Sequence, residues 1–431
     1  MLGGVHLTVA HRVPLDALAA LAFAGAGIAG ALLTAKRPAF GIAFLLVAGP
    51  FAWAHDIGPT QLSFPKVVLL GVLLGLAVRR APLGALRDPR VRPLVGGAFA
   101  ILAVTALTAI PATYIDATLR ETLKAAEYLL AFAAASLAIA TAEDEAVVRA
   151  SVLAGCALVC ATALAQYATG APSGALIDGR VIPRIAGALE GPNQLAGYLD
   201  LAIPVLLAGA LGRDRLRAAT WSVLAVAIAT DVLTLSRSGL LGAAAGIAVV
   251  LAFRARGTAL ALRLAAAAAV LFALVAVLGS RFGFLQRFLS LGEVQRENGL
   301  GTRAELWRAA IALSKTDPAL GIGAGNFELL LPAAGLVGVR THANSVYLQS
   351  LAEGGLALFF ALLWTIVSAI ALCLRAAPRS ALLLGIGAAT FGFAVHQVFD
   401  VLTFFPKVGG FWWLLLGAGT GRLHALEERA A

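Results

Sequence analysis

The chain has 431 residues, of which 60% are hydrophobic and only 13% carry a formal charge. Its mean hydropathy of +0.90 and the recurrence of apolar runs long enough to cross a bilayer exclude a single soluble core and favour a polytopic helical membrane protein. The net charge of +10 is concentrated in short clusters between these runs, a pattern typical of cytoplasmic loops rather than of a nucleic-acid-binding patch.

About thirteen apolar runs follow one another along the chain as candidate transmembrane helices. In chain order they are residues 16–34, 40–54, 65–78, 94–110, 123–140, 146–168, 194–211, 218–235, 239–253, 260–278, 345–374, 381–399 and 411–424. Pro50 lies inside the second run and indicates a broken or re-entrant helix there. The expected fold class is therefore an all-α integral membrane protein, a bundle of about 12–13 transmembrane helices with one large, partly helical periplasmic loop.

The basic clusters fix the orientation of this bundle, because short cytoplasmic loops carry an excess of Lys and Arg. They place the C-terminus in the cytoplasm and leave six segments outside: residues 55–64, 111–120, 169–192, 236–237, 280–344 and 400–410. The predicted organisation is N-terminal transmembrane helices (residues 1–279), a periplasmic loop domain (residues 280–344) and C-terminal transmembrane helices (residues 345–431). All three cysteines lie in or at the end of apolar runs, so we expect packing residues without a disulfide.

The long external segment has helical periodicity in its middle. One apolar face is formed by Ala304, Leu306, Trp307, Ala310, Ile311 and Leu313. This pattern predicts a helix that ends before Asp317 and Pro318, followed by a glycine-rich turn at residues 321–327. The segment is therefore predicted to be an ordered cap over the membrane bundle.

The same segment is rich in cations, namely Arg281, Arg287, Arg296, Arg303, Arg308, Lys315 and Arg340. Together with Arg184 and Arg237, which lie near the external ends of other runs, they indicate an anionic substrate. Arg237 is confined to a tight turn between Ser236 and Ser238; the alternative is an arginine that contacts lipid headgroups. Arginine suits a diphosphate because its planar fork makes bidentate bonds to phosphate oxygens.

Several converging arginines would stabilise a pyrophosphate leaving group without a metal ion. The sequence contains no metal-ligand cluster with suitable spacing and no nucleotide-binding fingerprint. We therefore expect neither a metal nor a cofactor.

His342 precedes the run at residues 345–374 and is a candidate general base for an attacking hydroxyl. The alternative, a polar residue at the membrane interface, stays equally open. Asp200 lies inside an apolar run, and Asp400 follows His396 by four residues, so that the latter two can share a helical face. Intramembrane acids can relay protons, but here a structural role as partners of arginines is favoured.

Four sequence blocks in fixed order resemble the O-antigen ligase and Wzy-type polymerase superfamily. The blocks are RIAGALEGPNQLAGYL at residues 184–199, LSRSG at 235–239, an external-loop signature formed by GTRAELW at 301–307 with PALGIGAGNF at 318–327, and YLQSLAEGGL at 347–356. They contain the supporting candidates Asn193, Trp307, Tyr347 and Glu353. The family usually has His-Asn directly before x-Tyr-Leu, whereas this chain has Asn344 and Ser345 there, and His342 two residues earlier.

The resemblance implies an inverting glycosyltransferase, multi-pass in the bacterial inner membrane, with its active site facing the periplasm. Its donor would be a glycan on undecaprenyl pyrophosphate, held by Arg237 and Arg303 with help from Arg184, while His342 activates the acceptor hydroxyl. With lipid A–core as acceptor the chain would be an O-antigen ligase. The alternatives are a polymerase that extends the lipid-linked glycan and, from a different class, a glycan flippase or transporter. Besides membrane lipids no further partner is expected, and no nucleic acid.

Overall fold

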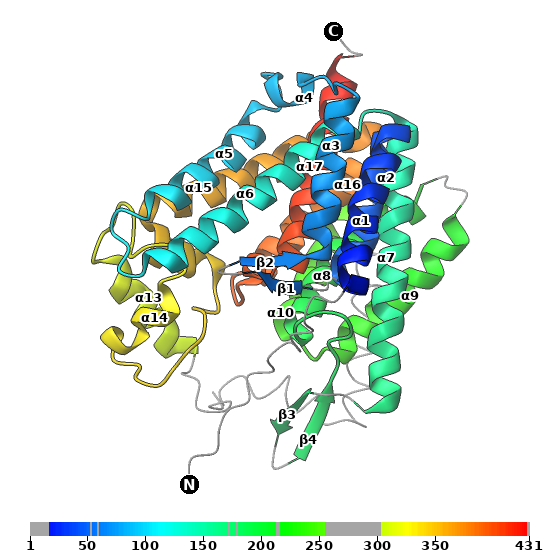
Figure 1. Ribbon diagram of the computed structural model, residues 1–431. Helices are drawn as coiled ribbons and strands as arrows, with labels where there is room; N and C mark the ends of the chain where they lie inside the picture. Colours follow the sequence, from blue (N-terminus) through cyan, green and yellow to red (C-terminus); the bar gives the residue numbers. More distant parts are fainter. Residues whose placement is uncertain are drawn as a thin grey trace.

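The computed structural model describes residues 17–51, 54–57, 60–170, 173–177, 180–212, 216–254 and 303–428, and these are mostly helical (Figure 1). The α-helices are α1 (Ala17–Lys36), α2 (Pro38–Ala48), α3 (Phe64–Val78), α4 (Gly84–Arg87), α5 (Arg92–Leu107), α6 (Ile115–Ala138), α7 (Ala142–Thr169), α8 (Pro192–Ala210), α9 (Arg217–Leu233), α10 (Arg237–Arg254), α13 (Arg303–Ser314), α14 (Phe327–Leu330), α15 (Val346–Ala376), α16 (Ala381–His396) and α17 (Pro406–Glu428). Short 3-10 turns are η1 (Gly49–Phe51), η3 (Leu331–Ala334), η4 (Ala377–Arg379) and η5 (Leu402–Phe404).

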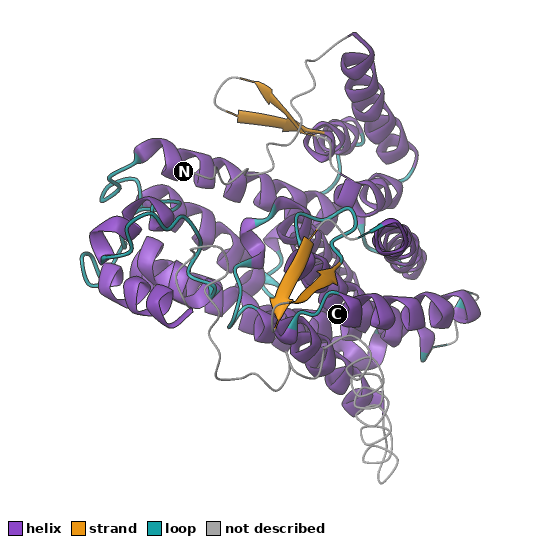
Figure 2. Cartoon of the chain, turned by 90° about the horizontal axis from the view of Figure 1, so that it is seen from below, coloured by secondary structure: helices purple, strands orange, loops and turns teal. Residues whose placement is uncertain are grey.

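Each predicted apolar run coincides with one helix, apart from residues 260–278, which lie outside the described residues. The second run is broken as expected: α2 ends at Ala48, and η1 contains Pro50. Two antiparallel hairpins, which the sequence analysis does not predict, interrupt the all-α architecture. They pair β1 (Ala54–Ile57) with β2 (Thr60–Ser63) and β3 (Ser173–Ile177) with β4 (Arg180–Arg184), and Figure 2 shows them well apart.

The centre of the bundle is formed by helices that are buried on all sides. From Leu195 to Ala210 every residue of α8 is buried, and α16 and α17 are buried along most of their length. Tyr198 of α8 stacks on Phe411 of α17 with ring centroids 4.6 Å apart. A helix that is apolar all round is stable only in such a position or in lipid.

Large apolar side chains also cover the outside of the bundle. On α15, Phe360, Trp364 and Val367 follow one another at helical spacing and are more than half exposed. Three described helices are long and apolar enough to cross a membrane, namely Ala142–Thr169, Arg237–Arg254 and Val346–Arg379, and several shorter apolar helices accompany them. An apolar outer surface of this kind is what a bilayer requires.

One end of the bundle gathers the basic clusters that are predicted to be cytoplasmic. Arg422 of α17 lies 3.1 Å from Glu145 of α7, and Arg37 lies 2.7 Å from Asp144. His424 lies 2.7 Å from Asp88 at the same end. These contacts join the N-terminal helices to α17, so the charges at this end have partners within the fold.

At the opposite end, α13 and α14 pack on a break in α15 (Figure 1). Gly355 has φ 60° and ψ −161°, a conformation that is open essentially only to glycine. The break exposes backbone groups: the carbonyls of Ala352 and Glu353 accept from Ile322 and Gly323 at 2.9 and 3.0 Å. In return, the amides beyond Gly355 donate to the carbonyls of residues 318 and 319 at 2.9 and 3.2 Å. The glycine-rich turn is thus hydrogen-bonded into the interrupted helix.

Asn326 fastens the same turn to the start of α6. Its side-chain oxygen accepts from the Tyr114 amide at 2.7 Å, and its nitrogen donates to Thr118 at 3.0 Å. Within α13, Leu306, Ala310 and Leu313 are buried as predicted, but the prediction is wrong for two members of the apolar face. Ala304 and Ile311 are exposed, because the buried face rotates through Ala309 and Ser314 instead.

Candidate functional site

Arg184 is anchored at the meeting point of three elements. At the end of β4, its Nε donates to the carbonyl of Thr234, just beyond α9, at 2.8 Å, and its Nη2 donates to Asn193 Oδ1 of α8 at 2.9 Å. The amide nitrogen of Asn193 donates in turn to Asp400 Oδ2 at 2.7 Å. Asp400 also accepts from the Val401 amide at 2.8 Å. Hydrogen bonds thus position one arginine, one amide and one carboxylate together.

Arg237 begins the helix that follows the Thr234 turn. Only three residues separate α9 from α10, and Leu235 takes a positive φ of 54° to close this turn. Ser236 Oγ accepts from the Gly239 amide at 3.2 Å, as an N-cap does. Arg237 is therefore half-buried in the first turn of α10, beside the carbonyl that binds Arg184.

Arg303 reaches the same region from the loop. Arg303 is the first residue of α13 and is exposed. Its positive charge acts on both Asp400 and His396. Burial raises the pKa of Asp400, while the Val401 amide and the charge of Arg303 oppose that rise. The structure therefore brings Arg184 and Arg303 to the same carboxylate, and it brings Arg184 to the turn that carries Arg237.

Trp307 covers this region from outside. Its ring lies 6.2 Å from that of Phe399, the residue before Asp400. The Nε1 of Trp307 is buried without a hydrogen-bond partner among the described residues. A buried N–H without an acceptor is costly, so this position favours a ligand oxygen or a water.

His342 lies against η5. Its ring is 4.1 Å from that of Phe404 and 5.9 Å from that of Phe405. Burial, together with the nearby cation of Lys124, lowers the pKa of His342 from 6.5 to about 4. The imidazole is neutral at pH 7, and its described contacts are with aromatic rings and Lys124 rather than with the arginines.

The remaining predicted residues hold the loop and its neighbours in place. Glu353 accepts from the Phe327 amide at 3.1 Å and from Gln349 at 2.8 Å, and Gln349 accepts from the Ala343 amide at 2.7 Å. Tyr347 donates its hydroxyl proton to a carbonyl of α16 at 2.8 Å. Asn344 stands at the family histidine position with φ 50°. These contacts are structural and fix the segment that carries His342.

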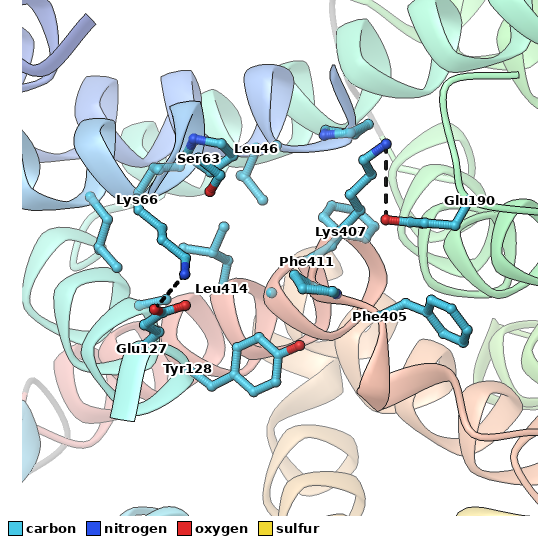
Figure 3. Close-up of a pocket in the computed structure, with 18 residues that line it drawn as sticks. Leu46, Ser63, Lys66, Glu127, Tyr128, Glu190, Phe405, Lys407, Phe411 and Leu414 are labelled. Carbon is cyan, nitrogen blue, oxygen red and sulfur yellow. Dashed lines mark ion pairs between the residues drawn. The ribbon is translucent and has the colours of Figure 1, made fainter. Parts of the chain in front are cut away.

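A cavity of about 360 Å³ lies between α2, α3, α6 and α17 at this end of the bundle (Figure 3). Its wall is mostly apolar and includes Leu46, Leu69, Ala131, Phe411 and Leu414. Two ion pairs border it: Lys66 lies 2.8 Å from Glu127, and Lys407 lies 3.9 Å from Glu190. The Lys407 ammonium also donates to the Ala188 carbonyl at 2.6 Å, which places the cavity beside the segment that joins Arg184 to Asn193.

Sequence reasoning missed the part that Asp400 plays. It paired Asp400 with His396 four residues earlier, whereas the carboxylate accepts from Asn193, and His396 binds Asp200. The position of Asp400 in an external segment was the one sequence feature that could have indicated its role in the site.

The loop cations Arg281, Arg287 and Arg296 lie outside the described residues. Among the residues that are described, no group of three or more His, Cys, Asp or Glu side chains could hold a metal ion.

Residues 222–363 match the O-antigen ligase family model, which covers about a third of the chain. Over this segment the chain is similar to the O-antigen ligase family. The match confirms the resemblance in the sequence and includes Arg237, Arg303 and His342. Arg184, Asn193 and Asp400 lie outside the matched segment, yet Arg184 binds the Thr234 carbonyl and the Asp400 carbonyl binds the Val346 amide, both within it. Among curated proteins, none matches the chain.

Proposed function

We propose that this protein is a glycan transferase of the inner membrane that moves O-antigen from undecaprenyl pyrophosphate to lipid A–core on the periplasmic side. The observation that carries the proposal is the network of Arg184, Asn193 and Asp400, which the loop residue Arg303 joins at the end of the bundle. Family members act on lipid-linked glycans, which suits such a site.

Pyrophosphate is the group that these arginines would hold. Each charge-assisted hydrogen bond to a phosphate oxygen contributes about 1.5–3 kcal/mol net. Arg184 is already oriented by Thr234 and Asn193, so little reorganisation is needed when an anion arrives. Preorganised donors of this kind stabilise the charge that develops on a leaving group.

The carrier chain would occupy the apolar cavity beside the arginines. A polyprenyl diphosphate has its hydrocarbon directly attached to the charged group, so a site for it needs an apolar cavity next to cations. The cavity lined by Leu46, Phe411 and Leu414 meets that need, and Lys407 lies between it and the arginine-bearing segment. Its walls come from helices outside the matched domain, which gives the N-terminal helices a part in substrate binding.

In the transfer step, the oxygen of the acceptor hydroxyl attacks the anomeric carbon of the donor sugar. The bond from that carbon to the pyrophosphate oxygen breaks, and its electron pair leaves with undecaprenyl pyrophosphate, so the configuration inverts. A group near the site must take the hydroxyl proton, and the resemblance implies His342 for that task.

The test is reconstitution of the purified protein in vesicles with an undecaprenyl-pyrophosphate glycan, with and without lipid A–core, in the presence of chelator and without nucleotide. Formation of lipopolysaccharide is the expected result. Elongation of the carrier-bound glycan alone would make the protein a polymerase instead. Movement of the glycan across vesicles without any transfer would overturn the enzyme assignment.

A further inference from the structure

A second cavity lies beside the one proposed for the carrier chain, which we call the carrier cavity. The second cavity has a volume of about 130 Å³ and lies between α5, α6, α15 and α17. Tyr128 of α6 lines both cavities, and its hydroxyl donates to the Thr403 carbonyl at 3.0 Å. Figure 3 shows the Tyr128 ring in the wall of the carrier cavity. The two cavities therefore share a wall at this side chain.

His342 adjoins both cavities. Phe404 lines the second cavity, and Phe405 lines the carrier cavity. The His342 ring contacts both, with its centroid 4.1 Å from that of Phe404 and 5.9 Å from that of Phe405. Gln349, in the wall of the second cavity, also accepts from the amide of Ala343, the residue after His342. A ligand in the second cavity would therefore lie beside the histidine.

The second cavity also adjoins the arginine site. Val346 and Val401 both belong to its wall. The Val346 amide donates to the Asp400 carbonyl at 2.9 Å, and the Val401 amide donates to the Asp400 carboxylate at 2.8 Å. The same carboxylate accepts from Asn193, which binds Arg184. The wall of the cavity is thus hydrogen-bonded directly to the network that is proposed to hold the pyrophosphate.

The wall of the second cavity combines aromatic rings with hydrogen-bonding groups. Tyr128 and Trp413 are stacked at 6.5 Å between ring centroids, and Phe404 adds a third ring. Glu121 and Gln349 supply a carboxylate and an amide. A carboxylate can accept about four hydrogen bonds, and an amide nitrogen has two donors, of which the Gln349 nitrogen uses one within the protein. A pyranose presents the matching groups, namely apolar C–H faces and a rim of hydroxyls.

The charges in the wall favour a neutral ligand. Lys124 Nζ donates to Glu121 Oε1 at 2.7 Å and to the Phe404 carbonyl at 3.1 Å, so this ammonium is already bonded within the wall. Among the described wall residues, two carboxyl groups, Glu121 and Glu353, stand against this one ammonium. An anion would therefore bind less well here than at the arginines. A hydrocarbon chain would leave the polar groups without partners, at a cost in free energy. A sugar with free hydroxyls meets both conditions.

We propose that the second cavity is the acceptor subsite of the transfer reaction, where the terminal sugar of the acceptor binds with its free hydroxyl beside His342. This rests on the proposed function. The carrier chain of the donor occupies the carrier cavity, so the two substrates reach His342 from cavities that meet at Tyr128. Holding both reactants in adjacent sites replaces a bimolecular encounter by a positioned reaction. The chemistry recognised is a neutral pyranose, which the end of lipid A–core or of a second lipid-linked glycan can supply.

The test measures kcat and the KM of each substrate in the vesicle assay, with the lipid-linked donor and lipid A–core varied separately. Ala125 belongs to the described wall of the second cavity and not to that of the carrier cavity, so Ala125→Leu narrows the second cavity alone. This variant is expected to raise the KM for lipid A–core about tenfold or more, the effect of a few methylene groups in a binding pocket, with the donor KM unchanged. Glu121→Gln, which keeps the shape of the side chain, is expected to raise the same KM about tenfold through the loss of charge-assisted hydrogen bonds.

Two control variants separate the cavities. Ala103→Leu makes the same change at an exposed position of α5 and should leave both KM values as in wild type. Ala131→Phe, in the carrier cavity, should give the opposite result, a higher KM for the donor alone. If wild type only extends the carrier-linked glycan, the same comparison is made with a glycan lipid that can serve only as acceptor. A selective rise in its KM then identifies the end of that glycan as the occupant.

Should Ala125→Leu fail to fold, Glu121→Gln decides. A wild-type KM for the acceptor in either folded variant, or an equal rise of both KM values, would overturn the acceptor subsite and leave the proposed function in place. Absence of transfer in wild type would instead refute the proposed function, and the acceptor subsite with it.

Discussion

Replacing Gly355 by alanine should detach the external loop from the bundle. Alanine at φ 60° and ψ −161° is strained by about 1–3 kcal/mol. Its methyl group would also overlap the backbone of Ala319. Relief of that overlap separates α15 from the loop and breaks the bonds from Leu356 to Pro318 and from Ala357 to Ala319.

The expected cost follows from these contacts. Two backbone hydrogen bonds contribute about 0.5–1.5 kcal/mol each, so with the backbone strain the docked loop loses about 2–6 kcal/mol. Alanine also favours a continuous helix, which would withdraw the carbonyls of Ala352 and Glu353 from the glycine-rich turn. Arg303 and Trp307 would then leave the arginine site together, although neither of them is mutated.

The assay is thermal unfolding in detergent, combined with limited proteolysis of the loop and with the rate of glycan transfer. Gly96→Ala is the matched control, since this exposed residue of α5 has open space where the methyl group would lie. We expect early proteolysis and loss of transfer in Gly355→Ala only. If Gly355→Ala matches the control in all three measurements, the proposed docking of the loop on the broken helix is wrong.

Three further predictions concern the site. Arg237→Ala and Arg303→Ala should each lower kcat/KM at least about tenfold, because a charge-assisted hydrogen bond contributes about 1.5–3 kcal/mol; near-normal transfer in both would reject their role. Because the pKa of His342 is lowered from 6.5 to about 4, the folded protein binds this proton less tightly than the unfolded chain. Stability present above pH 6.5 is therefore lost as the pH falls towards 4, by up to about 3 kcal/mol, and His342→Gln should flatten that dependence in unfolding experiments. Ala131→Phe fills the apolar cavity and should lower kcat/KM for the lipid-linked donor about tenfold, the effect of about two buried methylene groups. The exposed neighbour change Leu130→Phe is the control, and equal effects of the two would speak against the cavity as the carrier site.

The helices could be predicted because their signal is local. A run of apolar residues such as 381–399 has one stable solution in a bilayer, and α16 follows it closely. The two hairpins could not be predicted in the same way, since strands of four or five residues have no comparable signal. Their role depends on what they join: β4 ends at Arg184 and thereby delivers that side chain to the Thr234 carbonyl.

Residue type and position near the end of an apolar run predicted individual candidate residues, but not the contacts between them. Arg184, Arg237 and Arg303 were identified as candidates by their charge in external segments, but Asp400, on which the charges of Arg184 and Arg303 act, was not. The failure has a physical reason: spacing within one helix suggested Asp400 with His396. In the fold, His396 binds Asp200 of α8, and Asp400 accepts from Asn193. Tertiary distance overrides helical spacing wherever a nearer partner exists.

Asn193 shows why one uncharged residue belongs in a site of opposite charges. Its oxygen accepts from Arg184 and its nitrogen donates to Asp400, so only one orientation of the amide satisfies both neighbours. A carboxylate in this position would repel Asp400, and a cation would repel Arg184. Pro192 begins α8 immediately before it, and its fixed φ suits the first turn of a helix, so the amide is held at a rigid point. The Pro-Asn sequence therefore fixes the arginine before any anion arrives, which is what electrostatic stabilisation of a leaving group requires.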